Sequence, residues 1–409
     1  MTAYQNSIDQ ASPNSKTMLR AINALEPYDS SNINSDRFKT ALDHKIVRNI
    51  NGPALFLSRK TIRENLRALK SALPGVSIHY AVKANDHPDL LKTVAEEGHR
   101  FDICSAVEID KAAQAGANPI DLIHTHPIKS NQEIQDAINK GVRTFLIDNP
   151  DEIAKFDNYR DKVKLLVRFR AVSSAESAAA VQCNLSFKFG CAPQEIEELV
   201  NNINIRGIDF AGLAFHVGSQ CLAPDLYLKG INIAANVISK LQTQGIDCEI
   251  LDIGGGFPVE YVERVPDIET FCRPIRKALS SLIPPRVKMI SEPGRYISAS
   301  AVTLLVNVIG KSVRDGRPWY YLDDGLYGSF SGRLYDHCSY QALTNRNTTW
   351  VKSTLAGPTC DSIDVIYDDI LLPPLQIGDT LVFPVMGAYC QVSASRFNSL
   401  RQAETIVVD

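Results

Sequence analysis

Short apolar segments recur between residues 78 and 292, and each ends in a glycine or in a residue suited to chemistry. Helical patterns follow most of them, for example over residues 225–243 and 267–281. The segments end near Lys83, Asp102, His126, Asp148, Arg168, His216, Gly254 and Glu292. This alternation of strands and helices predicts a parallel (β/α)8 barrel. Active sites of such barrels form at the carboxyl ends of the strands, so these side chains should converge on one mouth.

The boundaries of the barrel elements follow from the same pattern. The predicted strands cover residues 78–82, 101–103, 121–126, 143–148, 164–170, 211–217, 248–253 and 287–291. A helix should precede them, and its apolar face consists of Ile62, Leu66, Leu69 and Leu73. Thr61 and Glu64 have the spacing of a capping box and should mark the start of this helix. Ser105 and Glu108 repeat that spacing after the second strand.

A second pattern begins near residue 300, where strands follow one another without long helices. The predicted strands are 301–309, 319–322, 381–384 and 404–408. They indicate an antiparallel β domain, which the strand at residues 53–57 should join because it has no place in the barrel. The predicted domains are therefore an N-terminal segment at 1–58, a barrel at 59–300 and a C-terminal β domain at 301–409. The Ala- and Ser-rich segment 171–184 is either a binding loop or a short irregular helix.

Composition excludes several classes of protein. The chain has 409 residues, more than the roughly 250 of a single barrel. Its net charge of −3 gives no basic footprint for nucleic acid. No apolar run approaches the ~18 residues of a membrane span, and the N-terminus lacks the apolar core of a signal peptide. Nine cysteines without CxxC spacing predict reduced thiols and a cytoplasmic location.

Lys83 is the first candidate for chemistry, because it ends the nearly apolar strand in His79–Asn85. A strand-end lysine is most often a solvated cap. In a barrel mouth it should instead be desolvated, which would lower its pKa and make the amine nucleophilic near neutral pH.

A glycine run and a following acid narrow the chemistry. Gly254, Gly255 and Gly256 follow a strand directly, and such loops converge backbone N–H groups on an anion, although a flexible turn is the alternative. Arg295 could bind a phosphate in two-pronged fashion. Glu292 would be repelled there unless it faces a cation such as a protonated pyridine nitrogen. A lysine, a phosphate cradle and a buried carboxylate together indicate pyridoxal 5'-phosphate (PLP) as cofactor.

Histidines fit this interpretation better than they fit a metal site. His216 could stack on the pyridine ring and Ser219 could bind the phosphate, although a buried neutral histidine is the alternative for His216. His124 and His126 share a face of the third strand, but two histidines without a matching carboxylate are a weak metal signal. We therefore predict no metal.

Taken together, these motifs resemble the fold-type III PLP-dependent amino-acid decarboxylases, with their alanine racemase-like fold, and most closely the eukaryotic-type ornithine decarboxylases. The motifs are YAVKAN, FDICS, LSFKFG, FHVGS, LDIGGGFP, EPGRY, DDGLYGSF, YDH, GPTCDSID and GAY, in the family's order from about residue 50 onward. The resemblance implies that Lys83 binds PLP covalently, that His216 stacks on its ring and that Glu292 pairs with its nitrogen. It implies that the phosphate is held by Ser219, Gly254, Gly255, Gly256, Arg295 and Tyr389. Asp102, Glu108 and Arg168 match positions around the cofactor.

The resemblance also implies an active site shared between two copies of the chain. Cys360 would protonate the substrate carbon after carbon dioxide leaves, in the barrel of the partner. Asp361 and Asp336 would bind the distal ammonium of the substrate, and the pocket would include Tyr335 and Phe397. Lys188 would pair with Asp364 across the dimer.

The expected substrate is a basic L-amino acid, ornithine first (giving putrescine for polyamine biosynthesis) and lysine second. Arg333 departs from the family pattern and leans toward diaminopimelate, whose distal carboxylate needs a cation. A modified or carrier-tethered amino acid is a further alternative. Alanine racemase shares the barrel but needs a tyrosine opposite the lysine. A catalytically dead regulatory homologue would not need to retain Lys83 and Cys360.

Overall fold

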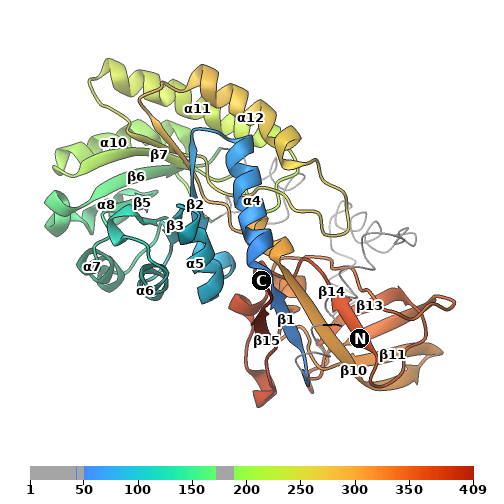
Figure 1. The fold of residues 1–409 in the computed structure, drawn as a ribbon. Helices are drawn as coiled ribbons and strands as arrows, with labels where there is room; N and C mark the ends of the chain where they lie inside the picture. Colours follow the sequence, from blue (N-terminus) through green and yellow to red (C-terminus); the bar gives the residue numbers. More distant parts are fainter. Residues whose placement is uncertain (1–42, 44–49, 172–187) are drawn as a thin grey trace.

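The computed structural model describes residue 43 and residues 50–171 and 188–409. Figure 1 shows two parts, a barrel covered by helices and a smaller part built almost entirely of strands, with α4 (Arg59–Ala72) leading from the second into the first. Most of the predicted loop at 171–184 lies outside the described residues.

The barrel is closed, as the strand–helix rhythm predicts. Its strands, neighbours in chain order, are β2 (Val76–Ala81), β3 (Arg100–Ile103), β4 (Ile123–His124), β5 (Thr144–Ile147), β6 (Lys164–Phe169), β7 (Asp209–Phe215), β8 (Ile250–Asp252) and β9 (Lys288–Ser291). Every pair is parallel, and β9 returns to pair with β2. The predicted (β/α)8 barrel is confirmed.

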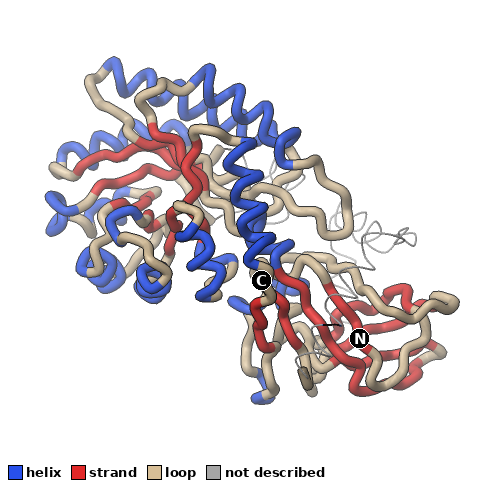
Figure 2. The backbone as a smooth tube through the Cα atoms, in the orientation of Figure 1, coloured by secondary structure: helices blue, strands red, loops and turns tan. Residues whose placement is uncertain are grey.

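Helices cover the outside of the barrel (Figure 2). They are α5 (Pro88–Glu96), α6 (Ala106–Gln114), α7 (Asn131–Asn139), α8 (Pro150–Ala154), α10 (Ile196–Ile205), α11 (Pro224–Thr243) and α12 (Ile268–Leu282), with α13 (Arg295–Ser298) after β9. The predicted apolar face of α4 is buried: Ile62, Leu66, Leu69 and Leu73 are at most 2% exposed.

The start of α4 differs from the prediction by one turn. Ser58, not Thr61, is the N-cap, because the Ser58 hydroxyl accepts a hydrogen bond from the Thr61 N–H at 3.1 Å. Both residue types cap helices well, and only the chain path selects between them. For α6, Ser105 is the N-cap as predicted. The Glu108 carboxylate, however, accepts from the Cys104 N–H at 2.6 Å instead of completing the box on Ser105.

The second part is a mostly antiparallel sheet. Its strands are β1 (Ala54–Leu57), β10 (Val302–Arg314), β11 (Arg317–Leu322), β12 (Val351–Ala356), β13 (Val365–Leu372), β14 (Thr380–Phe383) and β15 (Glu404–Val407), with the short α14 (Ser331–Tyr335) between β11 and β12. The order is β13-β12-β11-β10-β1-β15, and β14 also pairs with β10. β1 pairs with β10 on one side and with β15 on the other, so the strand at Ala54–Leu57 is part of this sheet.

An apolar layer fills the barrel interior beneath the carboxyl ends of the strands. It consists of Ile123, Leu146, Leu166, Ala211, Ala214 and Ile290. Because this layer closes the barrel from below, polar side chains one step further along the strands face the mouth. Within the described ranges, no helix is both long and apolar enough to cross a membrane.

Candidate active site

Lys83 and Asp102 form an ion pair at the barrel mouth. Lys83 lies just after β2, and its Nζ donates to Asp102 Oδ2 at 2.5 Å. Asp102 is buried at the end of β3 and also accepts from the Thr125 hydroxyl. Burial raises the pKa of Asp102 to about 6 despite the neighbouring Lys83.

The expectation that the pKa of Lys83 is lowered is wrong for this structure. Burial opposes the ammonium charge, but Asp102, Cys104 and Glu292 offset it and hold the pKa of Lys83 well above its usual value. The amine of Lys83 is therefore protonated, and it must lose a proton before its nitrogen can act as a nucleophile.

Two carboxyl groups lie side by side at the carboxyl ends of β8 and β9. Glu292 directly follows β9 and is buried, and burial together with Asp252 raises its pKa well above the usual value. Asp252, at the end of β8, is fully buried, and burial raises its pKa to about 6. Asp252 was not among the predicted site residues. Its signal was its position as the last inward-facing residue before the glycine run.

The glycine run is a packed cradle and not a flexible turn. A Cβ on Gly255 would lie 2.4 Å from the Glu292 carbonyl oxygen, and one on Gly256 would lie 2.2 Å from that of Gly218. Gly254 has φ +70° and donates its N–H to Asp252 Oδ1 at 2.8 Å. The N–H groups of Gly255 and Gly256 find no acceptor in the described part of the chain, as an anion cradle requires.

His216 faces this loop as a neutral imidazole. Its Nδ1 accepts from the Gly218 N–H at 2.9 Å, which leaves the proton on Nε2. Burial, Arg168 and Lys83 hold the pKa of His216 well below its usual value. Arg168 is itself buried and lies over the ring of Phe189, 5.5 Å from its centre.

Arg295 is the most heavily bonded cation of the mouth. Its Nη2 donates to Ser219 Oγ at 2.9 Å and to the Asp336 carboxylate, and its Nη1 donates to the Tyr261 hydroxyl at 2.7 Å. Asp336, predicted to bind the substrate, therefore pairs with a predicted phosphate ligand. Tyr261 was missed because it lies in a segment without a recognisable motif.

Tyr389 connects the β domain to the segment that carries Lys83. Its N–H donates to the Ala84 carbonyl at 2.9 Å, and the Arg295 guanidinium lies 5.1 Å from the centre of its ring. Tyr389 has φ +56°, a left-handed conformation that non-glycine residues adopt at a cost and that clusters at functional sites. Asn85 Nδ2 also donates to the Gly387 carbonyl at 2.9 Å, so two bonds join the domains here.

Cys360 and Asp361 lie in the turn between β12 and β13 of the β domain. Cys360 is exposed, and Asp361 accepts from the Tyr327 hydroxyl at 2.5 Å, which lowers the pKa of Asp361. Tyr327 stacks on Phe397, with ring centres 4.5 Å apart, and Phe397 is 40% exposed. Across the described residues, no contact joins Cys360 or Asp361 to Lys83. Tyr335, predicted to line the pocket, is 64% exposed.

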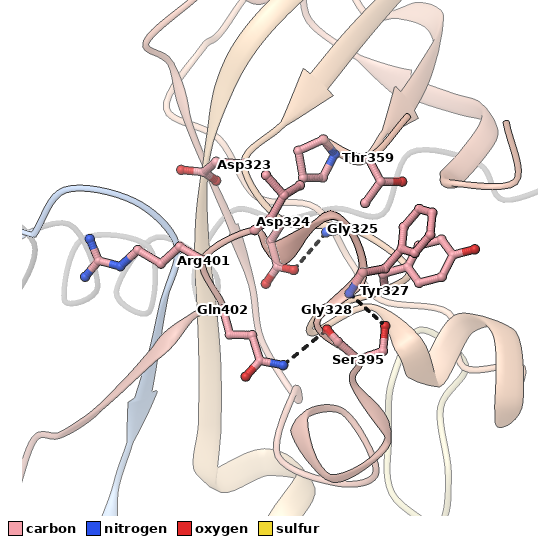
Figure 3. Close-up of a pocket in the computed structure, with 12 residues that line it drawn as sticks. Asp323, Asp324, Gly325, Tyr327, Gly328, Thr359, Ser395, Arg401 and Gln402 are labelled. Atoms are coloured by element: carbon pink, nitrogen blue, oxygen red, sulfur yellow. Dashed lines mark hydrogen bonds between the residues drawn. The ribbon is translucent and has the colours of Figure 1, made fainter. Parts of the chain in front are cut away.

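A pocket in the β domain lies beside this exposed group (Figure 3). It is bordered by the Asp323–Gly328 segment, by Pro358 and Thr359, and by the stretch from Ser395 to Gln402. In the close-up, the Gln402 side chain donates to the Ser395 carbonyl, and the Ser395 N–H donates to that of Tyr327. These bonds hold the walls around the base of the Cys360 turn.

Asp364 supports this turn from inside. It is 2% exposed and accepts from the Leu326 N–H at 2.7 Å and from the Thr359 hydroxyl at 2.7 Å. The pairing of Asp364 with Lys188 of a second copy stays a prediction, and Lys188 itself is exposed.

The two histidines of β4 and its loop contact different rings. His124 stacks on Phe145 and His126 packs edge-on against Phe189. Within the described ranges, no group of three or more His, Cys, Asp or Glu side chains is placed to hold a metal ion.

Comparison with known proteins identifies the family. Residues 59–299 match the family described as pyridoxal-dependent decarboxylase, pyridoxal binding domain. The chain is 35% identical to a lysine/ornithine decarboxylase of Selenomonas ruminantium, over 89% of this chain and 91% of that protein. A crystal structure of lysine/ornithine decarboxylase from Vibrio vulnificus, complexed with putrescine, aligns with a TM-score of 0.84 and 41% identity, covering 90% of this chain and 98% of that one. The arginine decarboxylase of Paramecium bursaria Chlorella virus aligns with a TM-score of 0.84 and 28% identity, covering 90% and 100%. The chain belongs to the pyridoxal-dependent decarboxylases.

The cofactor is therefore PLP, and the protein is a PLP-dependent carboxy-lyase of the class that acts on basic amino acids. The site fits this cofactor in its own right. It contains a lysine paired with a buried aspartate, a buried glutamate, and a glycine cradle that has no room for a side chain and whose Gly255 and Gly256 N–H groups have no acceptor among the described residues.

Proposed function

We propose that this enzyme decarboxylates L-ornithine to putrescine, and L-lysine second. The observation that carries the proposal is the acidity of the two β-domain positions predicted to bind the distal group, Asp336 and Asp361. A carboxylate suits an ammonium and repels a distal carboxylate. The Selenomonas and Vibrio relatives, both lysine/ornithine decarboxylases by name, are consistent with a diamino acid of this length.

Arg333, the residue that leaned toward diaminopimelate, is already engaged. Its Nε donates to the Ile366 carbonyl and its Nη1 to the Cys338 carbonyl, both at 3.1 Å. The guanidinium also stacks over Tyr367, 4.2 Å from the ring centre. An arginine held by two carbonyls and a ring joins α14 to β13, and these contacts support a structural role for it.

The barrel residues have the following proposed roles. Lys83 binds PLP covalently, and its ion pair with Asp102 keeps a proton available at Nζ. His216, neutral and fixed through Nδ1, covers one face of the ring. Glu292 holds the ring nitrogen protonated. Bound PLP supplies an electron sink for the charge left on the substrate carbon when carbon dioxide departs.

The phosphate is held, in this proposal, by the cradle at the opposite end of the mouth. Its members are Ser219, Gly254, Gly255, Gly256, Arg295 and Tyr389. Asp102 and Arg168 balance charge around the ring because both are buried within reach of Glu292.

We further propose that a second copy of the chain completes each site. Cys360 Sγ would deliver the proton to the substrate carbon, and Asp361 would read the distal ammonium. Cys360 and Phe397 are exposed on the β domain of their own chain, where a second copy could reach them, and this supports the arrangement. The domain limits at residues 58 and 300 and the cytoplasmic location also stay proposals.

A side-by-side assay of carbon dioxide release from ornithine, lysine, arginine and diaminopimelate tests the substrate. We expect the highest kcat/KM for ornithine and little turnover of diaminopimelate. Asp361→Ala should raise KM for ornithine about tenfold or more, because a charge-assisted contact is worth roughly 1.5–3 kcal/mol. Asp369→Ala, on the surface of β13, is the matched control and should leave KM unchanged. Preference for a substrate without a distal amine would overturn the assignment.

A further inference from the structure

The Arg295 guanidinium has no unused donor in this structure. Nε and Nη2 donate to Ser219 Oγ, Nη1 to the Tyr261 hydroxyl and to Cys338 Sγ, and Nη2 also to Asp336. These contacts account for every N–H that a guanidinium carries. To bind an added anion, Arg295 must therefore loosen or share one of these partners.

Of the hydrogen-bond partners of Arg295, Asp336 is the one that an added anion repels most strongly. Among the described residues that accept hydrogen bonds from Arg295, it is the only anion, and the side chains of the pair are 3% and 10% exposed. Two anions on one buried guanidinium repel each other, whereas neutral Ser219 and Tyr261 do not. The Cys338 thiol, 3.5 Å from Asp336, is a weaker donor than the guanidinium.

An anion entering the cradle thus changes the charge around Asp336. Without it, Arg295 and Asp336 neutralise each other. A phosphate monoester brings a charge of about −1.5 to −2, which attracts Arg295 and weakens its pairing with Asp336. A cation near Asp336 restores the balance. The two sites are joined through one guanidinium and not by a long chain of contacts.

We propose that Asp336 is held by Arg295 until a phosphate ester engages Arg295, so that the cofactor phosphate and the distal ammonium of the substrate bind cooperatively. This rests on the proposed function, in which Asp336 reads that ammonium. Cofactor loading then prepares the substrate pocket, and the protein without PLP binds diamines weakly. By linkage, a diamine strengthens phosphate-ester binding by the same factor, typically about 5- to 150-fold.

The experiment uses the full chain and probes that cannot react with each other. Pyridoxine 5'-phosphate has no aldehyde, so it does not combine with an amine, and pyridoxine differs from it only in lacking the phosphate. Calorimetry measures the Kd of putrescine for the PLP-free protein alone, with pyridoxine, and with pyridoxine 5'-phosphate. We expect at least a fivefold lower Kd with the phosphate ester only. Equal putrescine affinity in all conditions would overturn the coupling and leave the proposed substrate standing.

Asp336→Asn gives a second test, in which removing a charged group should strengthen binding of the phosphate ester. The amide removes the competing anion, so pyridoxine 5'-phosphate should bind several-fold more tightly, and putrescine should no longer improve its binding. If Asp336 has only a structural role, the Asp336→Asn variant should bind pyridoxine 5'-phosphate more weakly. Tyr261→Phe removes a neutral partner of Arg295 and is the matched control, which should keep the coupling.

Asp336→Glu keeps the charge and should also keep the coupling, which covers the case in which the asparagine variant does not fold. Weaker phosphate-ester binding by a folded Asp336→Asn would overturn the proposal. If no form binds putrescine although Asp336→Asn still tightens phosphate-ester binding, the diamine substrate is wrong and the coupling falls with it.

Discussion

At the scale of single residues, the charge of Glu292 should have a large effect on the rate of decarboxylation. It is buried beside Asp252, which raises its pKa, while Lys83 and Arg168 lower it. We expect Glu292→Gln to retain PLP but to lower kcat roughly 10²–10³-fold, because an amide cannot keep the ring nitrogen protonated. Steady-state kinetics and PLP content per chain measure the two effects. A near-normal kcat would show that Glu292 is structural.

Glu108 offers a pH test in the PLP-free protein. Burial raises the pKa of Glu108 to about 7, above its ordinary 4.5, so the folded state keeps a proton that the unfolded chain has lost. The folded state binds more protons between these values, so stability falls as pH rises through them and levels off above about pH 7.

Glu108→Gln removes this penalty and retains an acceptor for the Cys104 N–H. The variant should gain stability over wild type as pH rises from about 4.5 to 7, at about 1.4 kcal/mol for each unit of pKa shift. Urea unfolding at several pH values measures the difference. Glu64→Gln, on the exposed side of α4, is the control and should show no such trend. A constant difference across this range would contradict the assigned burial.

At this scale, the identities of the site residues were more predictable from the sequence than their protonation states. Lys83, His216 and Glu292 follow from their places at strand ends. The raised pKa of Lys83 depends on Asp102, which pairing of β2 with β3 brings within 2.5 Å, and a sequence contains no such distance.

At the scale of elements, the glycine cradle makes a sharp prediction. Gly255→Ala would push a methyl group toward the Glu292 carbonyl and His216 Nε2, at 2.4 and 3.2 Å. The loop must shift, and PLP should bind about tenfold more weakly or worse, a loss of about 1.4 kcal/mol. Gly310→Ala on β10 meets only ordinary contacts with Tyr321 and is the control. Cofactor titration by fluorescence compares them, and unchanged affinity in Gly255→Ala would refute the cradle.

The elements themselves show which signals a sequence contains. All eight barrel strands were predicted, because buried parallel strands read as apolar runs bounded by helices. β12 and β13 were missed because polar residues interrupt their apolar runs: Ser353 and Thr354 are buried within β12, and Asp368 and Asp369 lie in β13. The Ser58 cap was missed because two suitable hydroxyl residues lie three positions apart.

At the scale of the whole molecule, the two halves of the proposed chemistry belong to different parts of the fold, the barrel and the β domain. Lys83 is at the barrel mouth, whereas Cys360 is exposed on the β domain. The sequence contains both residues but does not indicate whether one chain or two copies bring them together, so the shared site could be predicted only from resemblance. If a second copy supplies Cys360, then Lys83→Ala and Cys360→Ala damage different components of each site.

Mixing the two inactive variants tests this arrangement. In a mixed dimer, one site contains both substitutions and the other contains neither. Random pairing of equal amounts makes half of the dimers mixed, each with one intact site, so about a quarter of wild-type activity should return if a twofold dimer forms and exchanges freely. Decarboxylation is assayed after exchange, which differently tagged copies verify by co-purification. Mixing Lys83→Ala with Glu292→Gln is the control, because both changes lie in the same barrel and leave every site damaged. If verified mixtures of Lys83→Ala and Cys360→Ala stay inactive, each site is built from a single chain.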